Sequence, residues 1–160
     1  MFYESIAKVY DYIFPKNRKQ LEFVESIKKI SIEEKILDIG CATGNLTELL
    51  GEKTGNVVGI DLDKELLKEA KDKHPNLNFE NMNMLEVNEK FEENSFDRVV
   101  SFGNTLVHLD SREEVEEFFQ KVYKTLKFNG LFIVQIINYN RVIEKNIKNL
   151  PTINKDRKST

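Results

Sequence analysis

Two carboxylates flank a turn of small residues. Residues 36–46 contain an apolar strand with Asp38 in it, and then a turn with Gly40 and Gly44. Glycines let the backbone turn sharply and let a ligand approach the main chain. Asp61 closes the next apolar run, 21 residues after Gly40. A carboxylate at that point can accept hydrogen bonds from both hydroxyls of a ribose, so the spacing predicts a nucleoside ligand.

The charge of the turn discriminates between nucleosides. The dinucleotide fingerprint Gly-x-Gly-x-x-Gly would need glycine at Ala42 and Asn45. Asp38 would repel a pyrophosphate and favour a ligand that carries positive charge. S-adenosylmethionine has a sulfonium and an amino group and no phosphate, so the residues favour it as the cofactor. A nicotinamide-dependent oxidoreductase is correspondingly disfavoured.

Alternating helices and strands must position this turn. The predicted elements are helices at 16–30, 45–50 and 64–73, a helix after Ser111, and strands at 35–39, 56–61, 77–81, 96–101 and 131–137. We expect Ser111 to cap its helix in a capping box with Glu114, and Asn129-Gly130 to end that helix. The alternation predicts an α/β domain with a parallel sheet and helices on both faces.

Five segments resemble the motifs of class I S-adenosylmethionine-dependent methyltransferases. In chain order they are ILDIGCATGNL, VVGIDLD, FENMNML, NSFDRVVSFGNTLVHL and LKFNGLFIVQIINYNR. They stand in the family's order, within a matched span of about residues 1–140. The resemblance implies a doubly wound, Rossmann-like, mostly parallel sheet of strand order 3-2-1-4-5. It also implies S-adenosyl-L-methionine as the cofactor, with Ala42 in place of the loop's common middle glycine.

The same resemblance assigns residues to the cofactor. The implied cofactor-binding residues are Tyr10, Asp38, Gly40, Cys41, Gly44, Asp61, Leu62, Asn83, Met84 and Phe102. Asn83 stands where family members often carry an aspartate for the adenine amino group, and its amide oxygen can accept that bond. Leu62 would pack on the adenine, and the backbone of Met84 would meet the ring. Core packing is the competing role for Tyr10 and Met84, and Cys41 is interpreted as a small buried residue.

The loop at 103–108 resembles that of small-molecule enzymes of the glycine N-methyltransferase type. Asn104 and His108 are therefore acceptor-site candidates, with a structural role for His108 weighted at least equally. Tyr139, which follows the fifth predicted strand, is the third candidate. Methyl transfer from a sulfonium is an in-line displacement that needs chiefly alignment, and a base only if the acceptor must lose a proton. No catalytic residue is assigned. The Asn/Asp-Pro-Pro-aromatic signature of DNA amino-group methylation is absent from FGNT, which disfavours nucleic acid as the partner.

Composition indicates one globular domain, with a core at 1–140 and a basic tail at 141–160. The chain has 160 residues and a net charge of −3, and its tail carries six basic residues against two acidic ones. The single cysteine excludes an intrachain disulfide and favours a cytoplasmic protein. The sequence indicates no zinc cluster, so no metal is predicted. It also contains no apolar run long enough to span a membrane.

The family's sheet normally ends in two further strands, and residues 138–160 are too short and too polar to form them. We expect either a fragment or a minimal version, with its fifth strand as an exposed edge available for self-association. A non-catalytic module that binds the cofactor, or a partner, is the alternative to an enzyme that methylates a small-molecule acceptor.

Overall fold

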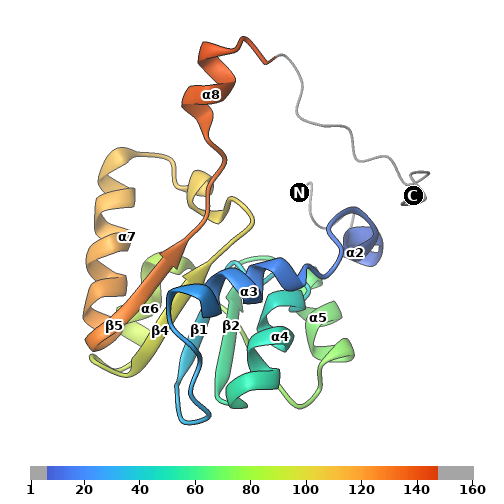
Figure 1. Ribbon diagram of the computed structural model, residues 1–160, viewed down its shortest axis with the longest axis vertical. Coiled ribbons are helices and arrows are strands. Elements are labelled where there is room, and N and C mark those ends of the chain that lie inside the picture. Colours follow the sequence, from blue (N-terminus) through green and yellow to red (C-terminus); the bar gives the residue numbers. More distant parts are fainter. Residues whose placement is uncertain (1–6, 148–160) are drawn as a thin grey trace.

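A computed structural model describes residues 7–147 and places five parallel strands in one sheet (Figure 1). The strands are β1 (Ile36–Ile39), β2 (Val57–Asp61), β3 (Asn78–Asn81), β4 (Phe96–Ser101) and β5 (Leu126–Val134). Their order across the sheet is β3-β2-β1-β4-β5, and every neighbouring pair is parallel. This confirms the α/β fold class and the strand order predicted from the sequence.

Helices cover both faces of the sheet. The helices are η1 (Ala7–Val9), α2 (Tyr10–Ile13), α3 (Arg18–Ile27), α4 (Asn45–Thr54), α5 (Lys64–Lys73), η2 (Met84–Glu86), α6 (Val87–Lys90), η3 (Thr105–His108), α7 (Arg112–Thr125) and α8 (Tyr139–Glu144). One hydrophobic cluster joins α3 and α4 to one face, and a second joins α6 and α7 to the other (Figure 1). A smaller cluster seats α5 beside β3.

Alternation along β1 explains why the strands read as continuous apolar runs. Ile36 packs in the α3–α4 cluster, whereas Leu37 and Ile39 pack in the α6–α7 cluster. Successive side chains of a strand point to opposite faces, and both faces of this sheet are covered. Asp38 therefore points toward α4, where its carboxylate accepts a hydrogen bond from Thr47.

The boundary between α7 and β5 differs from the prediction. We expected Asn129-Gly130 to end the helix, but α7 ends at Thr125 and β5 begins at Leu126. Asn129 has a φ of +61° inside β5, close to where the pairing with β4 shifts register between Phe96 and Arg98. A left-handed residue occurs in β-bulges as well as at helix ends, so the Asn129-Gly130 pair is compatible with either structure.

The helix cap before α7 is confirmed in part. The Ser111 hydroxyl accepts a hydrogen bond from the Glu114 N–H at 3.1 Å. The Glu114 carboxylate accepts from the N–H of Asp110, at 2.8 Å, and not from that of Ser111 as a standard capping box requires. The first helix, predicted at 16–30, is shorter than expected. It ends at Ile27, a residue that is half exposed.

The chain beyond β5 carries a helix that the sequence pattern did not predict. Asn138 caps α8 by accepting a hydrogen bond from the Arg141 N–H at 3.0 Å. In Figure 1, α8 projects away from the sheet. Residues 148–160 of the predicted basic tail lie outside the described residues. Within 7–147 the structure contains no helix that is long and apolar enough to cross a membrane.

β5 borders one strand only among the described residues, and β3 forms the opposite edge of the sheet. The exposed edge expected of the fifth strand is therefore present in this part of the chain. Self-association through that edge stays a prediction.

A buried ion pair ties β4 to the segment between α3 and β1. Arg98 is 1% exposed, and its Nε donates to Glu34 Oε2 at 3.1 Å. Its Nη1 donates to the carbonyls of Val24 and Lys28 at 3.2 and 3.0 Å. The guanidinium thus also donates hydrogen bonds to two carbonyls at the end of α3, and these bonds orient that helix on the sheet.

Replacement of Arg98 by Met should destabilise the protein strongly. The buried Glu34 would keep only the Lys28 ammonium, 4.0 Å away, among the ion pairs seen in the described residues. We expect the free energy of unfolding to fall by about 3–5 kcal/mol, measured by chemical denaturation. Arg112→Gln, which removes an exposed i,i+4 pair with Glu116, should cost less than about 0.5 kcal/mol. Equal losses of unfolding free energy in the two variants would show that the buried ion pair is not a main source of stability.

Candidate active site

The turn between β1 and α4 passes through three left-handed residues. Gly40, Ala42 and Gly44 have φ of +76°, +48° and +80°. The backbone N–H groups of Gly40 and Cys41 both donate to the Ile60 carbonyl, at 2.8 and 3.0 Å, which anchors the turn to β2. Gly44 is also the N-cap of α4 and supplies no side chain to cap it. The turn is therefore fixed to β2 and offers main-chain groups at the end of β1.

Asp61 lies beside this turn, as its place at the end of β2 predicts. Its Oδ2 accepts from the Ala42 N–H at 2.8 Å, and its Oδ1 accepts from the Asp63 N–H at 2.9 Å. Each carboxylate oxygen keeps a further lone pair for a ligand hydroxyl. Burial raises the pKa of Asp61 above its ordinary value, and the hydrogen bonds from Asp63 and Ala42 oppose that rise.

Asp38 is a buried carboxylate on the same rim. It is 2% exposed, and its Oδ2 accepts from the Thr47 hydroxyl at 2.7 Å. Burial raises the pKa of Asp38 to about 7; the hydrogen bond from Thr47 opposes this, and the charge of Asp61 adds to it. The folded protein keeps this proton to a higher pH than the unfolded chain does. Stability is therefore lost as the pH rises from about 4 through about 7.

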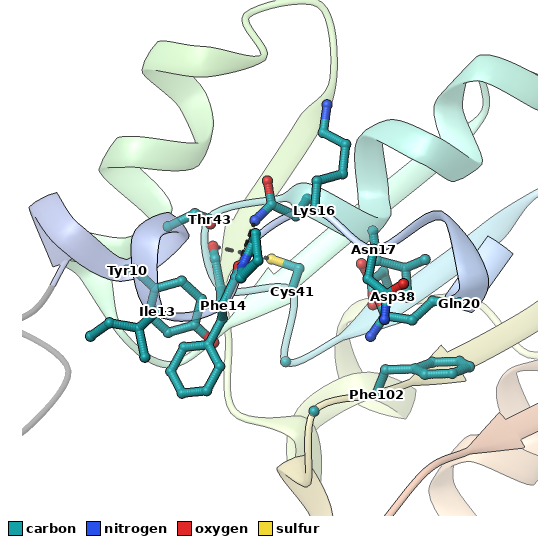
Figure 2. Close-up of a pocket in the computed structure, with 16 residues that line it drawn as sticks. Tyr10, Ile13, Phe14, Lys16, Asn17, Gln20, Asp38, Cys41, Thr43 and Phe102 are labelled. Carbon is teal, nitrogen blue, oxygen red and sulfur yellow. Dashed lines mark hydrogen bonds between the residues drawn. The ribbon is translucent and has the colours of Figure 1, made fainter. Parts of the chain in front are cut away.

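A cavity of about 520 Å³ opens between this turn and the segment that joins α2 to α3. Figure 2 shows Tyr10, Ile13 and Phe14 on one side of it, with Asp38 across from them and Phe102 nearby. Five of the predicted cofactor residues line it. They are Tyr10, Asp38, Gly40, Cys41 and Phe102.

Cys41 and Met84 have surroundings that fit the packing roles considered for them. Cys41 is 6% exposed, and burial raises the pKa of its thiol well above the ordinary value, which leaves it protonated and unreactive. Met84 packs, partly buried, against the α6–α7 cluster. Neither position shows the features of a nucleophile.

The residues predicted around an adenine lie outside the cavity. Leu62 is 65% exposed, and the Asn83 amide oxygen already accepts a hydrogen bond from the Leu85 N–H at 3.0 Å. The amide of Asn81 donates to the carbonyls of Asp61 and Leu62, at 3.1 and 2.9 Å, and so holds the end of β2 against β3. These contacts set the surface on which an adenine could lie beside Asp61.

Two of the three acceptor-site candidates touch each other. The Asn104 amide donates to the Tyr139 hydroxyl at 2.8 Å, and its oxygen accepts from the Ile137 N–H at 3.1 Å. Asn104 therefore joins the loop after β4 to the segment after β5. His108 is exposed, at the end of η3, and does not line the cavity.

His74, the C-cap of α5, lies mostly inside the fold. Its side chain is 11% exposed, and its Nδ1 lies 3.8 Å from Glu48 Oε1. A Cβ on Gly44 would come within 3.1 Å of its ring, so His74 supports the turn from below. Burial lowers the pKa of His74 and keeps the imidazole neutral near pH 7.

Sequence reasoning missed three polar residues that shape the turn: Thr43, Thr47 and Thr105. Thr47 is fully buried beside Leu46 and Leu49, and a polar residue on the inward face of a helix was the signal that could have revealed it. Thr105 packs directly against Gly40, where a Cβ would overlap its side chain. No sequence pattern predicts the contact of Thr105 with Gly40, because it joins two loops that lie far apart in the chain.

Gly40→Ala should destabilise the protein more than Gly103→Ala. Both glycines have a φ of +76°, so each alanine carries the left-handed cost of about 1–2 kcal/mol. A Cβ on Gly40 also overlaps Thr105, whereas nothing lies within 4 Å of one on Gly103. We expect about 1–3 kcal/mol of additional loss at Gly40, measured by denaturation. Equal losses would contradict close packing of Thr105 on the turn.

The comparisons with known proteins agree with this geometry. The family described as a methyltransferase domain matches residues 36–130, from β1 into β5. A candidate methyltransferase of Geobacillus is 32% identical over 85% of this chain and 58% of its own length. A glycine/sarcosine N-methyltransferase of Aphanothece halophytica is 26% identical over 81% of this chain and 50% of its own length. The chain thus spans between half and three fifths of these relatives.

Among solved structures, an S-adenosylmethionine-dependent methyltransferase from Clostridium acetobutylicum shares the fold. It superposes with a TM-score of 0.72 and 23% identity, over 91% of this chain and 61% of that protein. The family match spans more than half of the chain and includes the turn, both flanking aspartates, strands β1 to β4 and the first part of β5. The chain therefore belongs to the methyltransferase domain family, with the fold of its class I members.

Proposed function

We propose that this chain binds S-adenosylmethionine on the turn between β1 and α4 and transfers its methyl group to a small-molecule acceptor. The observation that carries the proposal is a pair of carboxylates, the buried Asp38 and the partly buried Asp61, on either side of a left-handed turn. A cationic nucleoside relieves the unfavourable burial of two acids, whereas a phosphate would worsen it.

The residues present fit this cofactor. Asp61 keeps a free lone pair on each oxygen and would accept from the two ribose hydroxyls. Asp38 would face the positively charged amino-acid end of the ligand. A Cβ on Gly40 would overlap Thr105 and one on Gly44 would overlap Phe79, so both positions of the turn require glycine. Leu62 and Asn83 would meet the adenine.

Methyl transfer from this cofactor does not by itself require an acid or base from the protein. The cofactor supplies a methyl group on a positively charged sulfur, which departs as a neutral thioether. The cavity walls from Tyr10, Phe14 and Phe102 would exclude water and align the acceptor, and alignment is the main contribution such a site makes. A base is needed only for an acceptor that must lose a proton.

The acceptor is proposed from the loop after β4 and its partners. The hydrogen-bonded pair of Asn104 and Tyr139 would border the site of the acceptor. Both residues belong to the proposed core at 1–140, which the basic segment 141–160 follows. A relative named for action on glycine and sarcosine supports a small amine. The alternative is a module that binds the cofactor without turnover. An assay for transfer of labelled methyl to a panel of small amines and carboxylic acids distinguishes the two, because only an enzyme labels an acceptor.

Asp61→Asn should lose most of its affinity for S-adenosylmethionine. The amide cannot accept at both of its ends, so one ribose hydroxyl loses a charged partner. We expect the dissociation constant, measured by calorimetry, to rise at least about tenfold. Asp63→Asn is the matched control, because asparagine can also cap α5 through Glu65 and Leu66. An unchanged affinity in Asp61→Asn would contradict the ribose assignment.

Affinity for S-adenosylmethionine should depend on pH through Asp38. In the ligand-free protein the pKa of Asp38 is raised to about 7, and a cation bound beside it favours the ionised form. Binding must then release a proton below that pH, so affinity should rise from about pH 6 to about pH 8 and level off. Calorimetry in buffers of different ionisation enthalpy measures both the affinity and the released proton.

Asp38→Asn provides the control for this titration. The variant keeps the shape of the side chain and an acceptor for Thr47, and it removes the ionisable group. We expect a lower affinity that no longer rises over this pH range. A slope that survives in the variant would assign the proton to another group, such as Asp61.

A further inference from the structure

A single carboxylate outside the turn gathers three segments of the chain. Asp11, in α2, accepts from the Thr43 hydroxyl at 2.5 Å and from the Asn45 amide at 3.0 Å, both through Oδ1. Its Oδ2 accepts from the Lys73 ammonium at 2.6 Å. Thr43 belongs to the turn, Asn45 begins α4, and Lys73 ends α5. Asp11 therefore joins the N-terminal segment to the turn and to both helices beside it.

The helix that carries Asp11 is short and has no buried side chain. α2 has four residues, none of them is buried, and its N-cap makes no side-chain hydrogen bond. A helix of this length is not stable alone and depends on tertiary contacts. The Asn45 amide adds a second tie by donating to the Phe14 carbonyl at 3.3 Å. Polar contacts, and not a buried apolar face, thus keep α2 against the turn.

The residues on either side of Asp11 form a wall of the cavity. Tyr10, Ile13 and Phe14 line it, and the rings of Tyr10 and Phe14 lie 4.9 Å apart. In Figure 2 these three side chains lie together beside Thr43. Asp11 itself points to the turn and is not among the lining residues. Its contacts decide where the wall stands relative to the turn.

The charge of Asp11 is permanent at ordinary pH. Burial alone would raise its pKa, but the hydrogen bonds from Lys73, Thr43 and Asn45, together with the charge of Lys73, lower it below the ordinary value. The carboxylate therefore stays ionised near neutral pH, and the clasp does not open by protonation there.

We propose that Asp11 is a positioning residue, a clasp that holds α2 against the turn and so slows the release of the cofactor. The proposal rests on the function proposed above. Acting through Thr43 and Asn45, the clasp fixes both the turn and the wall of Tyr10 and Phe14. It follows that loss of the clasp should speed dissociation much more than it slows association.

Surface plasmon resonance of the full chain with S-adenosylmethionine tests this. Asp11→Ala should raise the dissociation rate constant by about tenfold, the effect of a lost charged hydrogen bond, with a smaller change in the association rate constant. The matched control is Glu52→Gln, which removes an exposed ion pair between Arg18 and α4 without touching the cavity. The control should leave both rate constants within about twofold of the wild type.

Hydrogen exchange without ligand gives a second readout. In Asp11→Ala the amides at 10–14 and 42–46 should exchange faster, while those of β1 and β4 keep their wild-type protection. Asp11→Asn, which retains an acceptor for Thr43 and removes the charge opposite Lys73, serves if the alanine variant does not fold. The asparagine variant should show the same changes to a smaller degree.

The outcomes separate the two proposals. If the wild-type chain does not bind S-adenosylmethionine, the proposed function is wrong and the role of the clasp in cofactor release is wrong with it. If the wild type binds and the Asp11 variants release the cofactor at the wild-type rate, only the clasp is overturned. Faster exchange at 10–14 with unchanged release would mean that Asp11 merely anchors α2.

Discussion

The hydrogen bond from the Ala42 N–H to Asp61 is the contact on which the site depends. It holds the turn after β1 against the end of β2. The turn is left-handed at Ala42, a residue with a side chain, and that conformation costs about 1–2 kcal/mol relative to an ordinary one. The Ile60 carbonyl, which accepts from Gly40 and Cys41, and the carboxylate of Asp61 together offset that cost. A turn held in this way presents main chain to a ligand and cannot relax into a regular helix start.

Desolvation of two carboxylates gives the site its chemical preference. Asp38 and Asp61 both have raised pKa values because burial disfavours their charge, and the charge of Asp61 raises the pKa of Asp38 further. The two acids make the fold less stable than neutral side chains of similar size would at the same positions. A cation bound beside such acids would favour their ionised forms. Strain of this kind is typical of functional sites, where binding recovers what folding loses.

Three long-range contacts hold together the loops around the turn. Thr105 packs on Gly40, Asp11 accepts from Thr43, and Asn104 joins the loop after β4 to the segment after β5. Each contact connects a different pair of segments. The proposed cofactor and acceptor sides would therefore share one framework built from parts of the chain that lie far apart in sequence.

The sequence by itself determined what local pattern and chemistry can express. The bounds of α5 and β4 match those predicted, because caps, periodicity and apolar runs are properties of neighbouring residues. The positions of Asp38 and Asp61 at the ends of their strands followed in the same way. Only the tertiary structure decided that Asn129 bends a strand, that His74 lies under Gly44 and that Asp11 reaches the turn. These depend on which distant segments meet, and burial and hydrogen-bond partners exist only once they have met.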